Sequence, residues 1–172
     1  MMILVTGGSG SGKSAYAEKR LSEFRSARKI YIATMYPYDD ESHNRIRRHR
    51  TMRSGKGFET VERYTRIGGL ILPDSCSVLL ECMSNLTANE MFMEDGAGDD
   101  TVTVISQGIL DLKRQAENLV IVTNEIFSES AGYLGDTRKY QRYLGEINAF
   151  LAETADEVFE VVYGIPVPIK EG

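Results

Sequence analysis

The sequence has few of the residues that build disulfide frameworks, zinc sites or long linkers. Its 172 residues include two cysteines, two histidines and four prolines. Cys76 and Cys82 are too few for a disulfide framework and lack metal-ligand spacing, and two histidines argue against a structural zinc site. There is no internal repeat or low-complexity tract, so no linker is expected. These absences favour a soluble protein kept in the reduced cytoplasm.

Long apolar runs are absent as well. None approaches the roughly 18 residues that a membrane-spanning helix needs, so no span is expected. The N-terminus has a short apolar stretch without a basic flank or a cleavage signal, so it is not expected to be a secretory signal. At roughly 100–200 residues per domain, residues 1–172 are expected to form one nucleotide-binding domain.

Charge is distributed unevenly along the chain. The chain has 20 Lys and Arg and 25 Asp and Glu, a formal net charge of −5, which argues against a protein that coats nucleic acid or an anionic membrane. Residues 45–56 read RIRRHRTMRSGK and contain six basic residues and no acid; the remainder has a formal charge of −11. This cationic segment predicts an anionic ligand held at one place.

Short apolar runs alternate with longer amphipathic segments, which is typical of a parallel sheet covered by helices. The short runs show little alternation, as expected for strands buried on both faces. The expected strands are Met2–Val5, Ile30–Ala33, Val78–Leu80, Leu119–Val122 and Val158–Val162. Helical spacing is seen in Ala17–Phe24, Val102–Ala116 and Tyr140–Leu151. The acidic segment 93–100 is expected to be an exposed loop, and the fold class is α/β.

A glycine-rich motif directly follows the first expected strand. It consists of Gly7, Gly8, Ser9, Gly10, Ser11, Gly12, Lys13 and Ser14, which fit G-x-x-x-x-G-K-[ST]. Glycines let backbone N–H groups surround phosphate oxygens, and the following helix adds its positive N-terminal end. Lys13 can reach the β- and γ-phosphates, and the Ser14 hydroxyl can bind Mg²⁺. The alternative is a turn that binds nothing, but the strand-then-helix context favours a nucleoside triphosphate site.

Two glutamates follow expected strands, at the edge where open α/β sheets bind ligands. Glu81 comes directly after Val78–Leu80, and Glu125 comes after Leu119–Val122 and two polar residues. Either carboxylate can support the Mg²⁺ or can be a solvated residue that opens a loop. The direct strand-to-carboxylate step favours Glu81.

The cationic segment contains a candidate nucleophile. If it is helical, Arg45, His49 and Arg53 share one face. Guanidinium neighbours disfavour a charged imidazole, so His49 is expected to stay neutral and nucleophilic near pH 7, and the same arginines would bind a triphosphate. By themselves, however, these residues favour a solvated face with a surface histidine, and His43 is expected to be only that.

Further blocks complete a pattern along nearly the whole chain. In order, they are MMILVTGG-x-x-SGKS-x-x-AE ending at Glu18, Tyr31-Ile32-Ala33-Thr34, Arg45-Ile46-x-x-His49-Arg50-x-x-Arg53 with Thr60-x-Glu62, Leu80-Glu81-Cys82 with Asn89, Val122-Thr123-Asn124-Glu125, Ala155-Asp156-Glu157-Val158 and the ending from Gly164 to Lys170. Together these blocks resemble the bifunctional adenosylcobinamide kinase / adenosylcobinamide-phosphate guanylyltransferase family of cobalamin biosynthesis.

The resemblance implies a three-layer P-loop NTPase fold of the RecA-like type, with a mostly parallel sheet flanked by helices. It also implies two reactions. ATP or GTP first phosphorylates the primary hydroxyl of the aminopropanol arm of adenosylcobinamide. GTP then gives GMP to the enzyme, pyrophosphate leaves, and the GMP passes to the new phosphate to give adenosylcobinamide-GDP. Mg²⁺, small-molecule substrates and a homo-oligomer, a trimer in the family, are implied, with no nucleic-acid partner.

The resemblance also implies roles for residues at matching positions. His49 is the nucleophile that forms a phosphoramidate, which splits a difficult transfer into two easier ones. Lys13 is the second catalytic residue, and Ser14 and Glu81 hold the Mg²⁺. The implied nucleotide-binding residues are Gly7, Gly8, Ser9, Gly10, Ser11, Gly12, Lys13, Ser14, Arg45, Arg50, Arg53, Glu62 and Glu81.

The sequence departs from the family pattern at a few places. After Glu125 the family has a glycine-rich stretch ending in Ile-Val-Pro, whereas residues 126–132 here read IFSESAG, which leaves open how this region meets the corrinoid or the guanine. Ser54 stands where proline is common, and Phe58 stands where tryptophan is common. An aromatic side chain that can stack is therefore retained.

Three other functions stay open at this point. The enzyme can have only one of the two activities, or can be a P-loop kinase of another small-molecule alcohol. The third is a recombinase-like ATPase that uses the cationic segment on single-stranded nucleic acid. This function is disfavoured because the segment lacks interleaved aromatic residues for base stacking and the acidic remainder would repel a polyanion.

Overall fold

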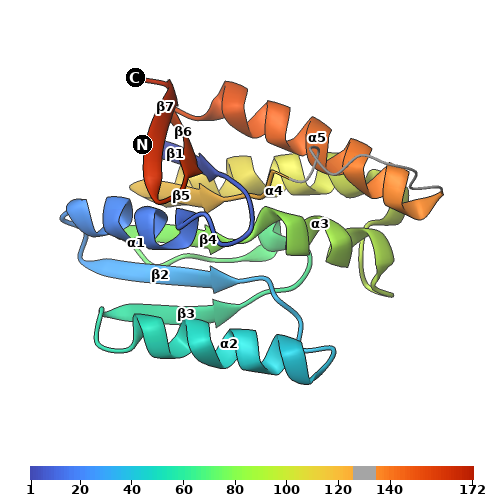
Figure 1. Ribbon diagram of the computed structural model, residues 1–172, viewed down its shortest axis with the longest axis horizontal. Helices are drawn as coiled ribbons and strands as arrows, with labels where there is room; N and C mark the ends of the chain where they lie inside the picture. The colour runs from blue at the N-terminus through green and yellow to red at the C-terminus, as the bar shows by residue number, and fades with distance from the viewer. Residues whose placement is uncertain (126–134) are drawn as a thin grey trace.

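The strands in the described part of the chain, residues 1–125 and 135–172, form one sheet in the computed structural model (Figure 1). Their order is β3-β2-β4-β5-β1-β6-β7. The neighbours from β3 through β6 pair in parallel, and β7 pairs antiparallel with β6. The strands span Met2–Thr6 (β1), Arg28–Ala33 (β2), Phe58–Glu62 (β3), Cys76–Glu81 (β4), Asn118–Val122 (β5), Glu157–Val162 (β6) and Ile165–Lys170 (β7).

The register of the parallel strands gathers their C-terminal ends at one edge. Glu81 of β4 is level with Ala33 of β2 and with Val122 of β5, and Val122 is in turn level with Val5 of β1. The loop that follows β1 and the carboxylate that ends β4 therefore meet at the same edge. Ligands of open α/β sheets bind at this edge.

Helices cover both faces of the sheet and make three layers. The helices span Lys13–Glu23 (α1), Asp40–Arg53 (α2), Met83–Phe92 (α3), Thr101–Gln115 (α4) and Asp136–Thr154 (α5), with short 3₁₀ turns at Ile67–Gly69 (η1) and Gly98–Asp100 (η2). α1 buries Ala17 and Leu21 in the cluster that contains Ile3 and Val120, on one face. α3, α4 and α5 pack on the opposite face, where they form the larger cluster. The expected three-layer α/β fold is confirmed.

α2 lies along β3 at the lower edge in Figure 1 and has well-defined ends. The Asp39 side chain caps it by accepting a hydrogen bond from the Ser42 backbone N–H at 2.7 Å. Acidic residues stand in its first turn and basic residues in its last turn, which suits the helix dipole. Gly55 and Gly57 follow with φ angles of 80° and 75°, and they turn the chain into β3.

The expected strands are all confirmed, but two further strands and α3 were missed. β3 and β7 were not predicted because they lie at the two ends of the sheet and lack a continuous buried run. Pro166 and Pro168 are tolerated in β7 because one side of an edge strand needs no ladder hydrogen bonds. Cys76 and Cys82 are free thiols. In residues 1–125 and 135–172, no helix is long and apolar enough to cross a membrane.

Candidate active site

The glycine-rich motif forms the loop between β1 and α1. Gly7, Gly10 and Gly12 have φ angles of 149°, 71° and 93°, which favour glycine over residues with a side chain. A Cβ atom at Gly7 would lie 2.6 Å from the carbonyl oxygen of Val161. α1 begins at Lys13, directly after the loop. The structure thus has the strand, loop and helix N-terminus that phosphate binding by this motif requires.

Lys13 and Ser14 are the first residues of α1. Lys13 Nζ donates a hydrogen bond to the Gly8 carbonyl at 2.9 Å, so the ammonium group lies against the loop. Burial lowers the pKa of Lys13, and the charges of Cys82 and Glu81 oppose this shift. Ser14 Oγ donates a hydrogen bond to Glu81 Oε1 and links the loop to the end of β4.

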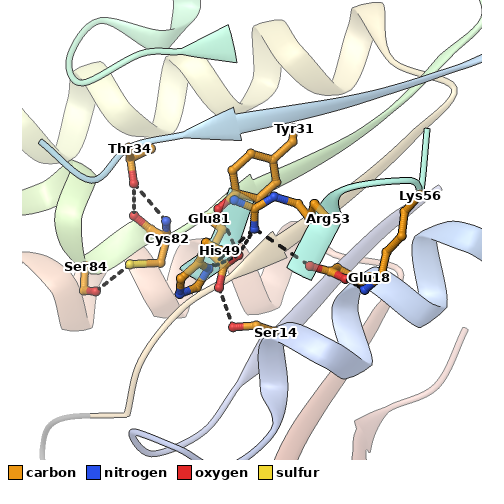
Figure 2. Close-up of polar contacts among 10 residues, drawn as sticks. All are labelled: Ser14, Glu18, Tyr31, Thr34, His49, Arg53, Lys56, Glu81, Cys82 and Ser84. Atoms are coloured by element: carbon orange, nitrogen blue, oxygen red, sulfur yellow. Dashed lines mark hydrogen bonds and ion pairs between the residues drawn. The ribbon is translucent and has the colours of Figure 1, made fainter. Parts of the chain in front are cut away.

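Glu81 lies at the centre of the polar contacts in Figure 2 and is only 8% exposed. Its carboxylate accepts a hydrogen bond from the Tyr31 hydroxyl at 3.0 Å. Arg53 Nη1 lies 3.6 Å and His49 Nδ1 3.7 Å from Glu81 Oε2. Burial by itself would raise the pKa of Glu81, but the contacts from His49 and Ser14 outweigh burial and lower it. The carboxylate is therefore ionised at neutral pH.

The cationic segment is helical up to Arg53, and its three expected residues share one face of α2. Exposure of their side chains falls along the helix, from 54% at Arg45 to 29% at His49 and 6% at Arg53. The Arg53 guanidinium stacks on the Tyr31 ring, 3.4 Å from its centroid. Phe58 packs edge-on against the same ring, so its aromatic contact is with the protein. The C-terminal end of α2 is thus the end that meets the sheet.

Two arginines of α2 are paired with carboxylates. Arg45 pairs with Glu41, one turn earlier, and Arg50 pairs with Glu62 at the end of β3. Glu62 also accepts a hydrogen bond from the Tyr64 hydroxyl. Burial is the main cause, and this hydrogen bond the second, that raises the pKa of Tyr64 to about 12, so the phenol stays protonated. Both arginine pairs are exposed and therefore weak. A phosphate can replace the carboxylate at either guanidinium.

One cavity of about 540 Å³ brings most of the expected site residues together. Those that line it are Ser9, Gly10, Lys13, Ser14, Arg45, His49, Arg50, Arg53, Glu62 and Glu81. Gly7, Gly8, Ser11 and Gly12 belong to the loop but not to the cavity lining. The phosphate loop and the candidate nucleophile therefore face the same space.

Several residues at the site were missed by sequence reasoning. Tyr31 was noted only as part of a motif, yet burial raises the pKa of its hydroxyl far above the ordinary value and keeps it a donor to Glu81. Glu18 ends the first motif, and its buried carboxylate contacts α2. Arg48 and Asn85 also line the cavity. Arg48 belongs to the cationic segment, but no local pattern signals Asn85, because only the fold brings α2 and α3 to one space.

Other candidates lie outside the cavity lining. His43 is exposed on α2, as expected. Glu125 does not line the cavity, and its backbone N–H donates a hydrogen bond to the Gly7 carbonyl at 3.2 Å. Its neighbour Asn124 does line the cavity. The altered segment 126–132 lies outside the described residues.

The oxygen atoms of Ser14 and Glu81 suit Mg²⁺. A hydroxyl and an ionised carboxylate in contact beside a phosphate loop are hard oxygen ligands, which this ion prefers. Among residues 1–125 and 135–172, no group of three or more His, Cys, Asp and Glu side chains could hold a metal.

The model of a family described as "Cobinamide kinase / cobinamide phosphate guanyltransferase" matches residues 3–169. The chain belongs to this family. It is 35% identical to the bifunctional adenosylcobalamin biosynthesis protein CobU of Escherichia coli (strain K12), over 99% of this chain and 100% of that protein. It is 26% identical to the bifunctional adenosylcobalamin biosynthesis protein CobP of Pseudomonas aeruginosa, over 99% of this chain and 98% of that protein.

Solved structures support the fold at much lower identity. The flagellar accessory protein FlaH from Methanocaldococcus jannaschii matches with a TM-score of 0.51 at 12% identity, over 99% of this chain and 78% of that chain. A prototypical ATPase from the type III secretion system of pathogenic bacteria matches with a TM-score of 0.55 at 8% identity, over 97% of this chain and 56% of that chain. These likenesses concern the fold only. The family to which the chain belongs, and not these neighbours, indicates its chemistry.

Proposed function

We propose that this chain phosphorylates adenosylcobinamide with ATP or GTP. It then transfers GMP from GTP to the phosphorylated product through a guanylylated histidine, giving adenosylcobinamide-GDP. Membership of the family supports both reactions. The observation that carries the proposal is the common cavity of the phosphate loop and His49, with Glu81 in contact with both sides.

The phosphate loop and Lys13 serve the phosphoryl transfer. The backbone N–H groups of the loop and the N-terminus of α1 bind the β- and γ-phosphates. The Lys13 ammonium neutralises charge that develops on the phosphate oxygens as the bond to the γ-phosphorus breaks. The hydroxyl oxygen of the acceptor forms the new bond to the γ-phosphorus, its proton passes to solvent, and the nucleoside diphosphate leaves with the electrons of the broken P–O bond.

His49 serves the guanylyl transfer. Its Nδ1 faces Glu81, and when Nδ1 carries the proton, Nε2 has the free lone pair. Nε2 attacks the α-phosphorus of GTP, the bond to the bridging oxygen breaks, and pyrophosphate leaves. An oxygen of the acceptor phosphate then attacks the same phosphorus, and the P–N bond breaks to restore neutral His49. Arg45, Arg50 and Arg53 offset the charge on the phosphate oxygens.

We assign the metal and the remaining nucleotide contacts to the loop and its neighbours. Ser14 and Glu81 would hold Mg²⁺, which when bound neutralises phosphate charge. The further nucleotide-binding residues are Gly7, Gly8, Ser9, Gly10, Ser11, Gly12 and Glu62. The trimer and the cytoplasmic location expected from the sequence stay predictions.

Mass spectrometry of the protein after treatment with GTP and Mg²⁺ tests the proposal. We expect one GMP adduct that is labile in acid and is located on His49, and no adduct on His49→Ala. The same variant should still phosphorylate adenosylcobinamide with ATP, because this reaction does not use the imidazole. His43→Ala, which changes the exposed histidine of the same helix, is the matched control and should keep the adduct.

The outcomes separate the alternatives. An adduct that survives in His49→Ala contradicts the assignment of the nucleophile. Phosphorylation without any adduct indicates a kinase with one activity. If the protein phosphorylates another alcohol but not adenosylcobinamide, the substrate assignment is wrong. Strong binding of single-stranded nucleic acid that weakens steeply with salt would instead support the ATPase alternative.

A further inference from the structure

α2 has little apolar surface with which to attach to the sheet. Among its 14 residues only Ile46 and Met52 are apolar, and a helix that is polar on all sides needs other contacts to hold it in place. Of the α2 side chains that the structure describes, only that of Arg53 is buried, and its guanidinium lies on the Tyr31 ring. His49 is one turn before Arg53, so its position depends on what holds Arg53.

A buried carboxylate on α1 meets this end of α2 and has no role in the two reactions described above. Glu18 is only 4% exposed. Its Oε2 accepts a hydrogen bond from Lys56 Nζ at 2.5 Å, and its Oε1 lies 3.8 Å from Arg53 Nη1. Figure 2 shows Arg53 between two carboxylates, Glu18 and Glu81. Because a buried carboxylate is costly unless it is paired, Glu18 and these cations depend on one another.

The same turn of α1 connects to the phosphate site. Ser14 and Glu18 are four residues apart and therefore lie on one face of the helix. Ser14 contacts Glu81, which ends β4, and Glu18 contacts Arg53, which ends α2. Arg53 Nη1 in turn lies 3.4 Å from His49 Nδ1. α1 thus sets the phosphate loop and the end of α2 relative to each other.

Building on the proposed role of His49, we propose that Glu18 is a positioning residue for guanylyl transfer. It neutralises Arg53 and Lys56 from the side opposite Glu81 and holds the end of α2 on α1. This places His49 where its free nitrogen can reach the α-phosphorus of a nucleotide in the phosphate loop. The phosphoryl transfer does not use His49, so Glu18 acts on one of the two reactions.

Glu18→Gln tests this role, since it keeps the shape of the side chain and removes its charge. The first readout is the single-turnover rate of self-guanylylation with labelled GTP and Mg²⁺, without acceptor. We expect this rate at saturating GTP to fall about 10- to 100-fold, because a small misplacement of a reacting group has effects of this size. The rate of phosphorylation of adenosylcobinamide by ATP alone should stay within about twofold. Both readouts come from the same full chain.

Two further variants separate positioning from folding. Glu23→Gln changes an exposed glutamate of the same helix and should alter neither rate. Lys56→Met removes the second partner of Glu18 at a side chain that is 46% exposed, so the fold should tolerate it. Its self-guanylylation should slow by a few-fold, about 2- to 10-fold. Lys19→Met, an exposed lysine of α1, is its control.

The comparison of the two activities decides the matter. Slower self-guanylylation with unchanged phosphorylation supports the positioning role. Equal self-guanylylation in wild type and Glu18→Gln overturns it, and so does a parallel loss of both activities in Glu18→Gln and Lys56→Met. If the wild type forms no adduct on His49, the proposed function itself is contradicted, which is a different result from an adduct that forms at the same rate in every variant.

Discussion

Two of the helices that line the candidate cavity, α1 and α2, are held in the molecule by different forces. α1 buries Ala17 and Leu21 in a core cluster, and it directly continues the loop after β1, an interior strand of the sheet. α2 is almost entirely polar and is attached through Arg53, which is stacked on Tyr31 and flanked by two carboxylates. The proposed phosphate-binding half of the site therefore depends on apolar burial and backbone geometry. The basic half, which contains the proposed nucleophile His49, depends on charge.

This contrast has a consequence for the two proposed reactions. Phosphoryl transfer needs mainly the phosphate-binding half, which is built into the core. Guanylyl transfer needs both halves, correctly placed relative to each other. Changes in the ionic contacts of α2 should therefore separate the two activities. Changes in the phosphate loop or in the apolar contacts of α1 should affect both.

The largest effect on activity is expected for Lys13→Ala, because this substitution changes the phosphate-binding half, which both reactions use. Loss of the buried ammonium should slow phosphorylation of adenosylcobinamide by about 10²- to 10³-fold, because charge on the transferring phosphoryl group is no longer neutralised. Steady-state assays with ATP measure this, and Lys19→Ala on the exposed side of α1 is the control. Undiminished phosphorylation by Lys13→Ala would show that the nucleotide binds elsewhere.

The second prediction compares apolar burial in the two helices. Leu21 of α1 is fully buried, and Leu21→Ala should lower the free energy of unfolding by about 2–5 kcal/mol. Ile46 of α2 is only partly buried, and Ile46→Ala should cost about 1 kcal/mol or less. Urea denaturation measures both values. Similar losses of free energy of unfolding in the two variants would mean that apolar contacts hold α2 on the sheet.

The third prediction concerns the carboxylate that joins the two halves. The pKa of Glu81 in the folded protein is below its ordinary value of 4.5, so its ionised form stabilises the fold above pH 4.5, and this contribution is lost as the pH falls through the folded pKa. Glu81→Gln should lower the free energy of unfolding by about 1–3 kcal/mol at neutral pH. The difference from wild type should shrink in denaturation series as the pH is lowered below 4.5. A difference that grows in acid would contradict this sign.

The smallest effect on the free energy of unfolding is expected for the exposed ion pair between α2 and the end of β3. The side chains of Arg50 and Glu62 are 60% and 42% exposed, and such pairs contribute about 0–1 kcal/mol. Glu62→Gln should therefore change the free energy of unfolding by less than about 1 kcal/mol, and salt should abolish the difference. A larger loss would show that the ionic attachment of α2 extends well beyond Arg53.

The elements that could be predicted from the sequence are those in which a local apolar run or stripe indicates burial. β1, β4 and β5 are continuous apolar runs, and α4 and α5 carry apolar stripes at helical spacing. β3 and β7 lie at the sheet ends, where strands need no such run, and α3 buries polar side chains such as Asn89, which donates hydrogen bonds to the Thr34 and Tyr64 carbonyls. Polar burial of this kind leaves no periodic apolar signal.

The residues of the site also differ in how far the sequence predicts them. The phosphate loop is local in sequence, since its glycines, Lys13 and Ser14 are consecutive, and the strand before it and the helix after it are evident from the pattern. Glu81 could be proposed because strand ends gather at one sheet edge. The groups that hold the end of α2 could not be predicted, because Tyr31 and Glu18, which contact Arg53, come from elements that are distant from α2 in the chain.

By itself, then, the sequence determined the α/β class, the phosphate loop and a cationic segment that contains one candidate histidine. Only the tertiary structure decided that this histidine faces the phosphate loop and not the solvent. The reason is physical: a polar helix carries no apolar stripe that dictates which way it packs. Its placement follows from where buried carboxylates and an aromatic ring meet its arginine, and these groups come together only when the sheet has formed.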